Sequence, residues 1–259
     1  MRKKIIAGLL LLISFEGFSQ TNHLPLNDDN SDFFVRTEKE QLKYLDSLYV
    51  AETGYGSDFI NGRDYIQYYF RSDQKPILHY DRERTASLIY RGRIYNNLVL
   101  QYDTYSDKVI YSDNSMVYND IVRQVSLNND NINRFILYFD NDTLTFRYFS
   151  DKSDPAFNLE DGFYEVVYDG TCKYLVRHKS TKYKLHGVDE YSYKPSGYVS
   201  VGDGFVRITS RKQFVNLFSG KSEEINRIIA EKRIKIRMAD KHQIADILRF
   251  YESIGTGRR

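Results

Sequence analysis

The chain has 259 residues, and its aromatic content comes from 23 Tyr and 16 Phe, with no Trp. Four Pro and 15 Gly are too few for a fibrous or disordered chain, and a net charge of +2 argues against a dedicated nucleic-acid binder. The single cysteine, Cys172, excludes an intramolecular disulfide. Because Tyr and Phe favour half-buried pleated surfaces, we expect a chain rich in β-strands.

The first residues have the pattern of a secretory signal peptide. The basic segment Arg2–Lys4 precedes an apolar run, Ile5–Ile13, and the small residues Gly17 and Ser19 suit the narrow subsites of signal peptidase. The apolar run is about half the ~20 residues that a membrane-spanning helix needs. We therefore expect residues 1–19 to be removed, and the mature chain to be periplasmic or extracellular with no transmembrane segment.

Residues 20–57 predict a polar leader followed by a short helix. The leader is rich in Asn and Asp, as in a mobile terminus. Thr37 and Glu40 then have the spacing of a capping box. Leu42, Leu45 and Leu48 recur on one helical face after it.

Residues 58–196 have the pattern of an antiparallel β-domain. Three turn sequences, Arg91-Gly92, Asp140-Asn141-Asp142 and Asp169-Gly170, each lie between two runs of strand-forming residues. No long helical segment separates these runs, which excludes a parallel sheet. We expect an antiparallel meander, built either as a sandwich or as an open curved sheet.

Residues 197–259 predict one more hairpin, around Gly202-Asp203-Gly204, followed by short amphipathic helices. Ser210, Ser222 and Asp240 mark the starts of these helices. Short helices of this kind need a surface to cover, so this segment is expected to form either a helical cap on the sheet or a small α+β subdomain. The whole chain is then mainly β, or α+β overall.

Charge is unevenly distributed along the chain. Residues 205–259 contain 13 Lys or Arg and six Asp or Glu, a net charge of +7, which leaves −5 for the rest. One interpretation is that the two oppositely charged parts attract each other, or that they differ in charge with no functional consequence. The other is that the basic helices face a protein partner or the anionic surface of the cell envelope.

Three stretches carry a resemblance to a known group of proteins. They are Phe59–Tyr65, Leu98–Asp103 and Gly162–Gly170. Together with the hairpin-and-helix ending, they resemble an uncharacterised family of exported Bacteroidetes proteins that bear signal peptides. The resemblance implies a source and a compartment, and it assigns no catalytic residues because its motifs are strands and turns.

The cysteine and the histidines are the candidate catalytic or metal-binding residues, and none of them lies in a recognisable motif. Cys172 needs a nearby base to form a thiolate, and His178, six residues on, is roughly 20 Å away along a strand. His79 and Asp81 could orient an imidazole on one strand face, although a surface pair is the commoner arrangement. His23, His186 and His242 complete the histidines, and no two histidines have a metal-ligand spacing.

Two oxygen-rich stretches and one group of glycines are candidate binding sites. Asn128–Asn131 and Asp140–Asp142 could bind calcium, but both lack the calcium-loop pattern, and Asn and Asp are also common in turns. Gly197, Gly202 and Gly204 have no helix directly after them, as a phosphate-binding loop requires. The sequence therefore predicts no catalytic, cofactor-binding or metal-binding residues and no cofactor.

Tyrosine is the remaining enrichment. The dense positions are Tyr65, Tyr68, Tyr69, Tyr90, Tyr95, Tyr102, Tyr105, Tyr111 and Tyr118. Such residues either fill a half-buried sheet or form an exposed face that binds a partner. We favour an exported, non-catalytic envelope protein that binds a protein or other partner through a Tyr-rich sheet. The alternatives are a curved-sheet carrier of an apolar ligand or lipid, and a hydrolase whose site lacks a sequence motif.

Overall fold

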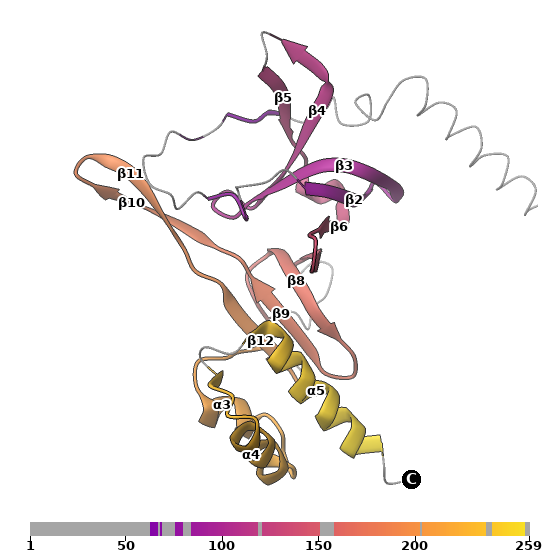
Figure 1. Ribbon diagram of the computed structural model, residues 1–259, viewed down its shortest axis with the longest axis vertical. Helices are drawn as coiled ribbons and strands as arrows, with labels where there is room; N and C mark the ends of the chain where they lie inside the picture. The colour runs from indigo at the N-terminus through magenta and orange to yellow at the C-terminus, as the bar shows by residue number, and fades with distance from the viewer. Residues whose placement is uncertain are drawn as a thin grey trace, which may run out of the picture. The chain divides into compact units, whose positions relative to one another are not determined.

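Figure 1 shows a computed structural model of the chain. It describes residues 63–66, 68, 76–79, 84–118, 121–150, 158–202, 204–236 and 240–256, which all belong to a compact unit, Tyr55–Arg259. The expected signal peptide, polar leader and first helix lie outside the described residues, so they stay predictions. None of the helices in the described ranges is long and apolar enough to cross a membrane.

The described part of the chain is mainly β, as the sequence predicts, and its main sheet is open and entirely antiparallel. The strands of this sheet are β1 (Arg63–Asp64), β2 (Arg84–Tyr90), β3 (Arg93–Asp103), β4 (Lys108–Tyr118), β5 (Ile121–Ser126), β6 (Ile132–Tyr138), β7 (Thr143–Phe149), β8 (Gly162–Asp169), β9 (Lys173–Arg177), β12 (Ser196–Ser200) and β13 (Val206–Arg207). Their spatial order is β1-β5-β4-β3-β2-β6-β7-β8-β9-β12-β13. Of the two expected architectures, the open sheet is therefore confirmed.

The four predicted hairpins are all present. Arg91 and Gly92 join β2 to β3 with φ angles of 51° and 78°, the left-handed pair that a tight two-residue hairpin requires. Asp140–Asp142 joins β6 to β7, Asp169-Gly170 opens the turn from β8 to β9, and the glycine-rich turn around Gly202 joins β12 to β13. Local turn chemistry therefore sets most of the strand order.

One connection departs from a simple meander. β6 pairs with β2 rather than with β5, although only residues 127–131 separate β5 from β6. In a flat sheet those two strands would be about 19 Å apart, whereas this link, which contains the 3-10 helix η1 (Asn129–Asn131), spans about 17 Å at most. The sheet must curl to bring these ends together.

The curled half of the sheet encloses the larger hydrophobic core. Its buried members come from β2 to β8, except for one residue in the loop before β2 and one in the link between β5 and β6: Leu78, Ala86, Leu88, Tyr90, Tyr95, Leu98, Leu100, Tyr102, Val109, Tyr111, Val125, Leu127, Ile132, Phe135, Leu137, Leu144, Phe146 and Phe163. The rings of Phe135 and Phe146 stack at its centre with centroids 4.6 Å apart.

A second core lies under a C-terminal helical cap. The cap consists of α3 (Arg211–Asn216), α4 (Ser222–Glu231) and α5 (Lys241–Thr256), and α5 lies against β8 and β9 (Figure 1). The helices begin at the predicted positions, since Ser210 caps α3 by accepting a hydrogen bond from the backbone N–H of Gln213. Apolar residues of all three helices, including Phe214, Ile225 and Ile244, pack against β9 and β12.

A two-stranded ribbon between β9 and β12 has no counterpart among the strands predicted individually from the sequence. β10 (Ser180–Leu185) pairs with β11 (Val188–Tyr193) in a sheet of its own (Figure 1). His186 and Gly187 form its turn with φ angles of 50° and 79°. Histidine tolerates this left-handed conformation better than most residues. The pair His186-Gly187 is therefore compatible with a tight turn, although histidine is not a common turn residue.

Candidate functional site

The candidate site lies where the two hydrophobic cores meet. On one face of the sheet, cross-strand pairing places Glu165 of β8 directly between Phe146 of β7 and Val176 of β9. Phe146 belongs to the larger core and Val176 to the core under the cap. Glu165 is only 3% exposed, and a buried carboxylate is stable only when charged or polar partners surround it.

One partner of Glu165 is a histidine at the end of the neighbouring strand. The Nε2 atom of His178 lies 2.8 Å from Oε2 of Glu165, and the Nδ1 atom lies 2.5 Å from the hydroxyl of Tyr193. The Tyr193 ring also stacks on the imidazole, with an interplanar angle of 19°. These contacts form a continuous carboxylate–imidazole–phenol relay from the core to the surface.

The second partner comes from the cap. The Nζ atom of Lys241, at the start of α5, lies 2.5 Å from Oε1 of Glu165 and 2.8 Å from Oδ2 of Asp142. Asp142 is the last residue of the predicted Asp140-Asn141-Asp142 turn. Lys241 therefore joins the helical cap to both the β6–β7 turn and the centre of the sheet.

The charges of this cluster stabilise one another. Burial alone would raise the pKa of Glu165, but the hydrogen bonds and charges of His178 and Lys241 outweigh burial and hold that pKa below its usual value. Burial opposes the charged form of Lys241 as well, yet Asp142 and Glu165 raise its pKa. Glu165 and Lys241 are therefore an ion pair at neutral pH.

This cluster lines a cavity of about 590 Å³ between the sheet and the cap. Its floor is formed by the apolar or aromatic side chains of Leu144, Tyr174, Val176, Ile236 and Ile244. Each of these residues is less than 9% exposed. Its polar lining consists of the carboxylate–imidazole cluster together with His79, Asp142, Tyr193, Lys194, Ser196, Arg207, Thr209 and Lys241. Cavities of about 300–1,000 Å³ with this mixed lining are typical of small-molecule sites.

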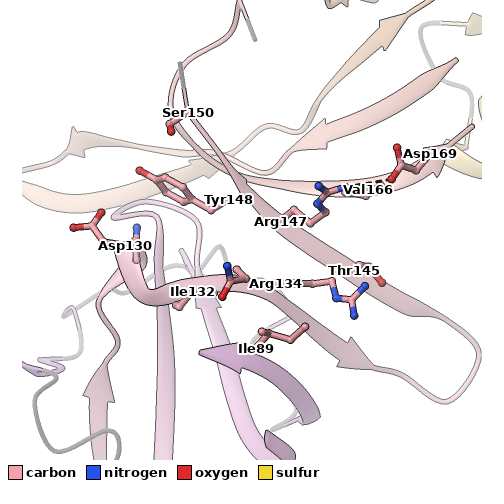
Figure 2. Close-up of a pocket in the computed structure, with 12 residues that line it drawn as sticks. Ile89, Asp130, Ile132, Arg134, Thr145, Arg147, Tyr148, Ser150, Val166 and Asp169 are labelled. Carbon is pink, nitrogen blue, oxygen red and sulfur yellow. Dashed lines mark hydrogen bonds and ion pairs between the residues drawn. The ribbon is translucent and has the colours of Figure 1, made fainter. Parts of the chain in front are cut away.

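A larger cavity, of about 750 Å³, opens along β6, β7 and β8. Figure 2 shows Arg147 and Asp169 close together in it, with Ile89 and Arg134 at some distance from them. The facing charges are solvated, since the side chains of Arg147 and Asp169 are 47% and 45% exposed. An ion pair in water contributes little to recognition, so the cavity that contains the buried Glu165 is the better candidate.

Two of the three relay groups, Glu165 and Tyr193, have pKa values shifted by their surroundings. Burial and the nearby Glu165 carboxylate raise the pKa of the Tyr193 phenol, so this hydroxyl keeps its proton at neutral pH. Both carboxylate oxygens of Glu165 already accept hydrogen bonds from charged or titratable groups. A phenol that stays protonated and a carboxylate whose oxygens are both engaged favour ligand positioning over attack on a substrate.

Cys172 lies outside this site. It is 1% exposed in the turn between β8 and β9 and belongs to the core under the cap. Burial and the nearby Glu252 carboxylate raise the pKa of its thiol to about 11. None of the hydrogen bonds among the described residues joins its sulfur to a histidine, so the structure places it as a core residue.

The other residues singled out in the sequence are dispersed. His79 lines the rim of the cavity, whereas His186 is at the exposed tip of the β10–β11 ribbon. Asn128 caps the 3-10 helix through the backbone N–H of Asp130, which is a turn role. His23 and Asp81 lie outside the described residues. In the described ranges, no group of three His, Cys, Asp or Glu side chains is placed to hold a metal ion.

Most of the described tyrosines are structural. Tyr90, Tyr95, Tyr102 and Tyr111 are buried in the larger core. Tyr65, Tyr68, Tyr105 and Tyr191 pack edge to face or at a tilt around Asp103, a buried carboxylate that accepts hydrogen bonds from the hydroxyls of Tyr65 and Tyr68. Tyr69 and the side chain of Tyr118 lie outside the described residues. The exposed tyrosines of the described ranges are Tyr105, which belongs to that cluster, and Tyr138, Tyr183 and Tyr193.

Glu165, Tyr193 and Lys241 are not predicted as a site from the sequence. One signal was available, because Glu165 is the only charged residue between Phe163 and Tyr168 in a strand that is otherwise apolar or aromatic. A lone carboxylate within such a strand indicates a buried partner. Its partner Lys241 is 76 residues away, so only the folded chain identifies it.

Comparisons with known proteins provide no identity. No family model, curated protein or solved structure matches the chain. The resemblance to exported Bacteroidetes proteins therefore stays a prediction.

Proposed function

We propose that this chain is a non-catalytic binding protein that holds a small molecule in the cavity between the sheet and α5. The observation that carries this proposal is the combination of a 590 Å³ cavity, an apolar floor and a buried Glu165 whose two oxygens are both bonded. Such a cavity accepts an apolar body on its floor and orients polar groups at its rim.

The non-catalytic assignment follows from the state of the polar groups. A general base needs an unengaged lone pair close to the proton that it removes. In this cavity Glu165 is ionised but held by Lys241 and His178, and Tyr193 keeps its proton. A hydrolase that uses the Glu165–His178–Tyr193 relay stays the alternative, and it would require Tyr193 to lose its hydrogen bond to His178 during turnover.

We also propose that the protein acts outside the cytoplasm, because residues 1–19 have the pattern of a signal peptide.

The helical cap would offer a docking surface to the anionic envelope. Lys232, Arg233 and Lys235 are exposed just after α4, and none of them forms an ion pair with an acidic side chain in the described ranges. A protein partner on the sheet surface is a separate prediction that the cavity does not require.

An uncharged fluorescent probe, N-phenyl-1-naphthylamine, tests the proposed cavity. We expect saturable binding with one probe per chain, because the cavity offers one apolar floor. Thr209→Trp places an indole at the rim of the cavity and is expected to weaken probe binding at least tenfold. Thr209 is itself exposed, so this change does not disturb a core.

Thr181→Trp is the matched control, because Thr181 is an exposed threonine on the β10–β11 ribbon and does not line the cavity. This variant should bind the probe as the wild type does. Equal binding by the wild type and both variants, or no saturable binding by the wild type, would contradict the proposed function. Circular dichroism confirms that each variant is folded.

A further inference from the structure

The fixed charges that line the cavity are unbalanced. Its carboxylates are Asp142 and Glu165, and its permanent cations are Lys194, Arg207 and Lys241. Lys241 binds both carboxylates at once, with Nζ–oxygen distances of 2.8 and 2.5 Å. The acids of the cavity are thus already neutralised in part by one lysine, and Glu165 is further bonded to His178.

The two remaining cations have no carboxylate partner among the described residues. Arg207 of β13 donates one hydrogen bond, 2.9 Å long, from Nη2 to the hydroxyl of Ser196. Its guanidinium has further donors, because arginine carries five N–H groups. Lys194 lies two residues before Ser196, and both cations are exposed at the rim of the cavity.

The two cations and the apolar floor lie in different parts of the cavity. Ile236 and Ile244 are buried at the floor, whereas Lys194 and Arg207 stay in contact with water. An anion at the rim would keep part of its hydration and gain charge-assisted hydrogen bonds, so it would avoid the cost of full burial. A cation at the rim would meet like charge.

We propose that the ligand of this cavity is an anionic amphiphile, a molecule with one carboxylate or phosphate head and an apolar body. Arg207 and Lys194 bind the head, and Ile208, Ile236 and Ile244 contact the body. This inference rests on the proposed function, because it names the ligand class of the same cavity. Lys241 then offsets part of the negative charge of Asp142 and Glu165, which lessens their repulsion of the head.

Isothermal titration calorimetry with a matched ligand series tests the inference. The probes share a ten-carbon chain: decanoate, decyl phosphate, decan-1-ol and decyltrimethylammonium, each below its micellar concentration. Acetate and inorganic phosphate serve as heads without a body. We expect the two anionic amphiphiles to bind one per chain and about tenfold more tightly than decan-1-ol, since one charge-assisted contact changes affinity by about that factor. The cationic amphiphile should bind most weakly, and the free heads should not bind measurably.

Two glutamine variants assign the preference to the rim. Arg207→Gln and Lys194→Gln should each reduce the preference of the cavity for decanoate over decan-1-ol, and the double variant should abolish it. Decan-1-ol should bind these variants as it binds the wild type. Arg227→Gln is the control, because Arg227 is exposed on α4, does not line the cavity and forms no ion pair in the described ranges.

The outcomes separate the two proposals. Equal binding of decanoate and decan-1-ol by the wild type, with both weakened by Thr209→Trp, overturns the anionic class and keeps the cavity. Tight binding of acetate or phosphate alone overturns the amphiphile and indicates a free-anion site. Binding of none of the four amphiphiles overturns both the ligand class and the proposed function. An undiminished anionic preference in the Arg207→Gln, Lys194→Gln double variant places the head elsewhere and overturns the inference.

Discussion

Lys241 and Glu165 form the ion pair that joins the helical cap to the sheet, with 2.5 Å between Nζ of Lys241 and Oε1 of Glu165. The lysine begins α5, and the carboxylate sits at the centre of β8 between two hydrophobic cores. The side chain of Glu165 is 3% exposed and that of Lys241 is 22% exposed, so the pair is largely removed from water. A pair of this kind fixes the position of the cap, and with it the shape of the cavity.

Removing the lysine should destabilise the protein. Lys241→Met leaves the buried Glu165 with one partner fewer, and breaking one side of a buried ion pair typically costs about 3–5 kcal/mol. Because Lys241 is partly exposed, we expect a loss of about 2–3 kcal/mol in the free energy of unfolding, measured by urea denaturation. Lys179→Met is the control, since the pair of Lys179 with Glu160 is exposed and should contribute less than about 1 kcal/mol. Equal losses in the two variants would show that the Lys241 pair is not buried in solution.

Stability should depend on pH through Glu165. Its pKa is lower in the folded protein than its usual value of 4.5, so the folded state favours the ionised carboxylate. The resulting stability is fully present above pH 4.5 and is lost as the pH falls through the lowered pKa. Urea denaturation between pH 7 and pH 3 should give a steeper fall for the wild type than for Glu165→Gln. Asp142, whose pKa is also lowered, keeps some slope in the variant. Parallel curves would contradict this role of Glu165.

Gly162 should be intolerant of any side chain. Its φ angle is 144°, and a Cβ there would overlap the guanidinium of Arg177 and the carboxylate of Asp107. These two groups form an ion pair, with 3.0 Å between Nη2 of Arg177 and Oδ2 of Asp107. We expect Gly162→Ala to lower the free energy of unfolding by about 2–4 kcal/mol, because it adds backbone strain to the loss of a nearly buried pair.

Gly187→Ala separates the two contributions to that loss. Gly187 has a φ angle of 79°, and no atom lies within 4 Å of a Cβ built there. This variant should therefore show only the cost of the left-handed backbone, about 1 kcal/mol. A loss as large as that of Gly162→Ala would mean that the contacts with Arg177 and Asp107 contribute nothing.

Cys172 should react slowly with thiol reagents. Its side chain is buried and the pKa of its thiol is raised to about 11, so little thiolate exists at pH 8. We expect 5,5′-dithiobis(2-nitrobenzoic acid) to label the native protein at least a hundredfold more slowly than the urea-unfolded protein. Labelling at the same rate in both states would place this cysteine on the surface.

The parts of the fold that local chemistry specifies could be predicted from the sequence. Arg91-Gly92 and Asp140–Asp142 were identified as turns because tight hairpins need residues that tolerate special backbone conformations. Leu98, Leu100 and Tyr102 alternate along β3 and are all buried, as the period of a strand requires. The pairing of β6 with β2 could not be predicted, because it depends on how the whole sheet curls.

The site could not be predicted for a related reason. Glu165, His178 and Tyr193 come from three neighbouring segments, but Asp142 and Lys241 reach them only after the β6–β7 turn and α5 have docked. Tyrosine enrichment was compatible with a half-buried sheet or with an exposed face, and Tyr90 and Tyr102 fill the core. Residue type predicts the strands, but only the packing of the folded chain distinguishes a buried tyrosine from an exposed one.

Methyl NMR of the isoleucine side chains tests the cavity most directly. Titration of the protein with decanoate should shift the δ1-methyl signals of Ile208, Ile236 and Ile244, which line the cavity. The signal of Ile94, which is 68% exposed and does not line it, should stay in place. This result would locate the ligand beneath α5. Shifts confined to Ile94, or no saturable shift at the three cavity isoleucines, would contradict a binding site in this cavity.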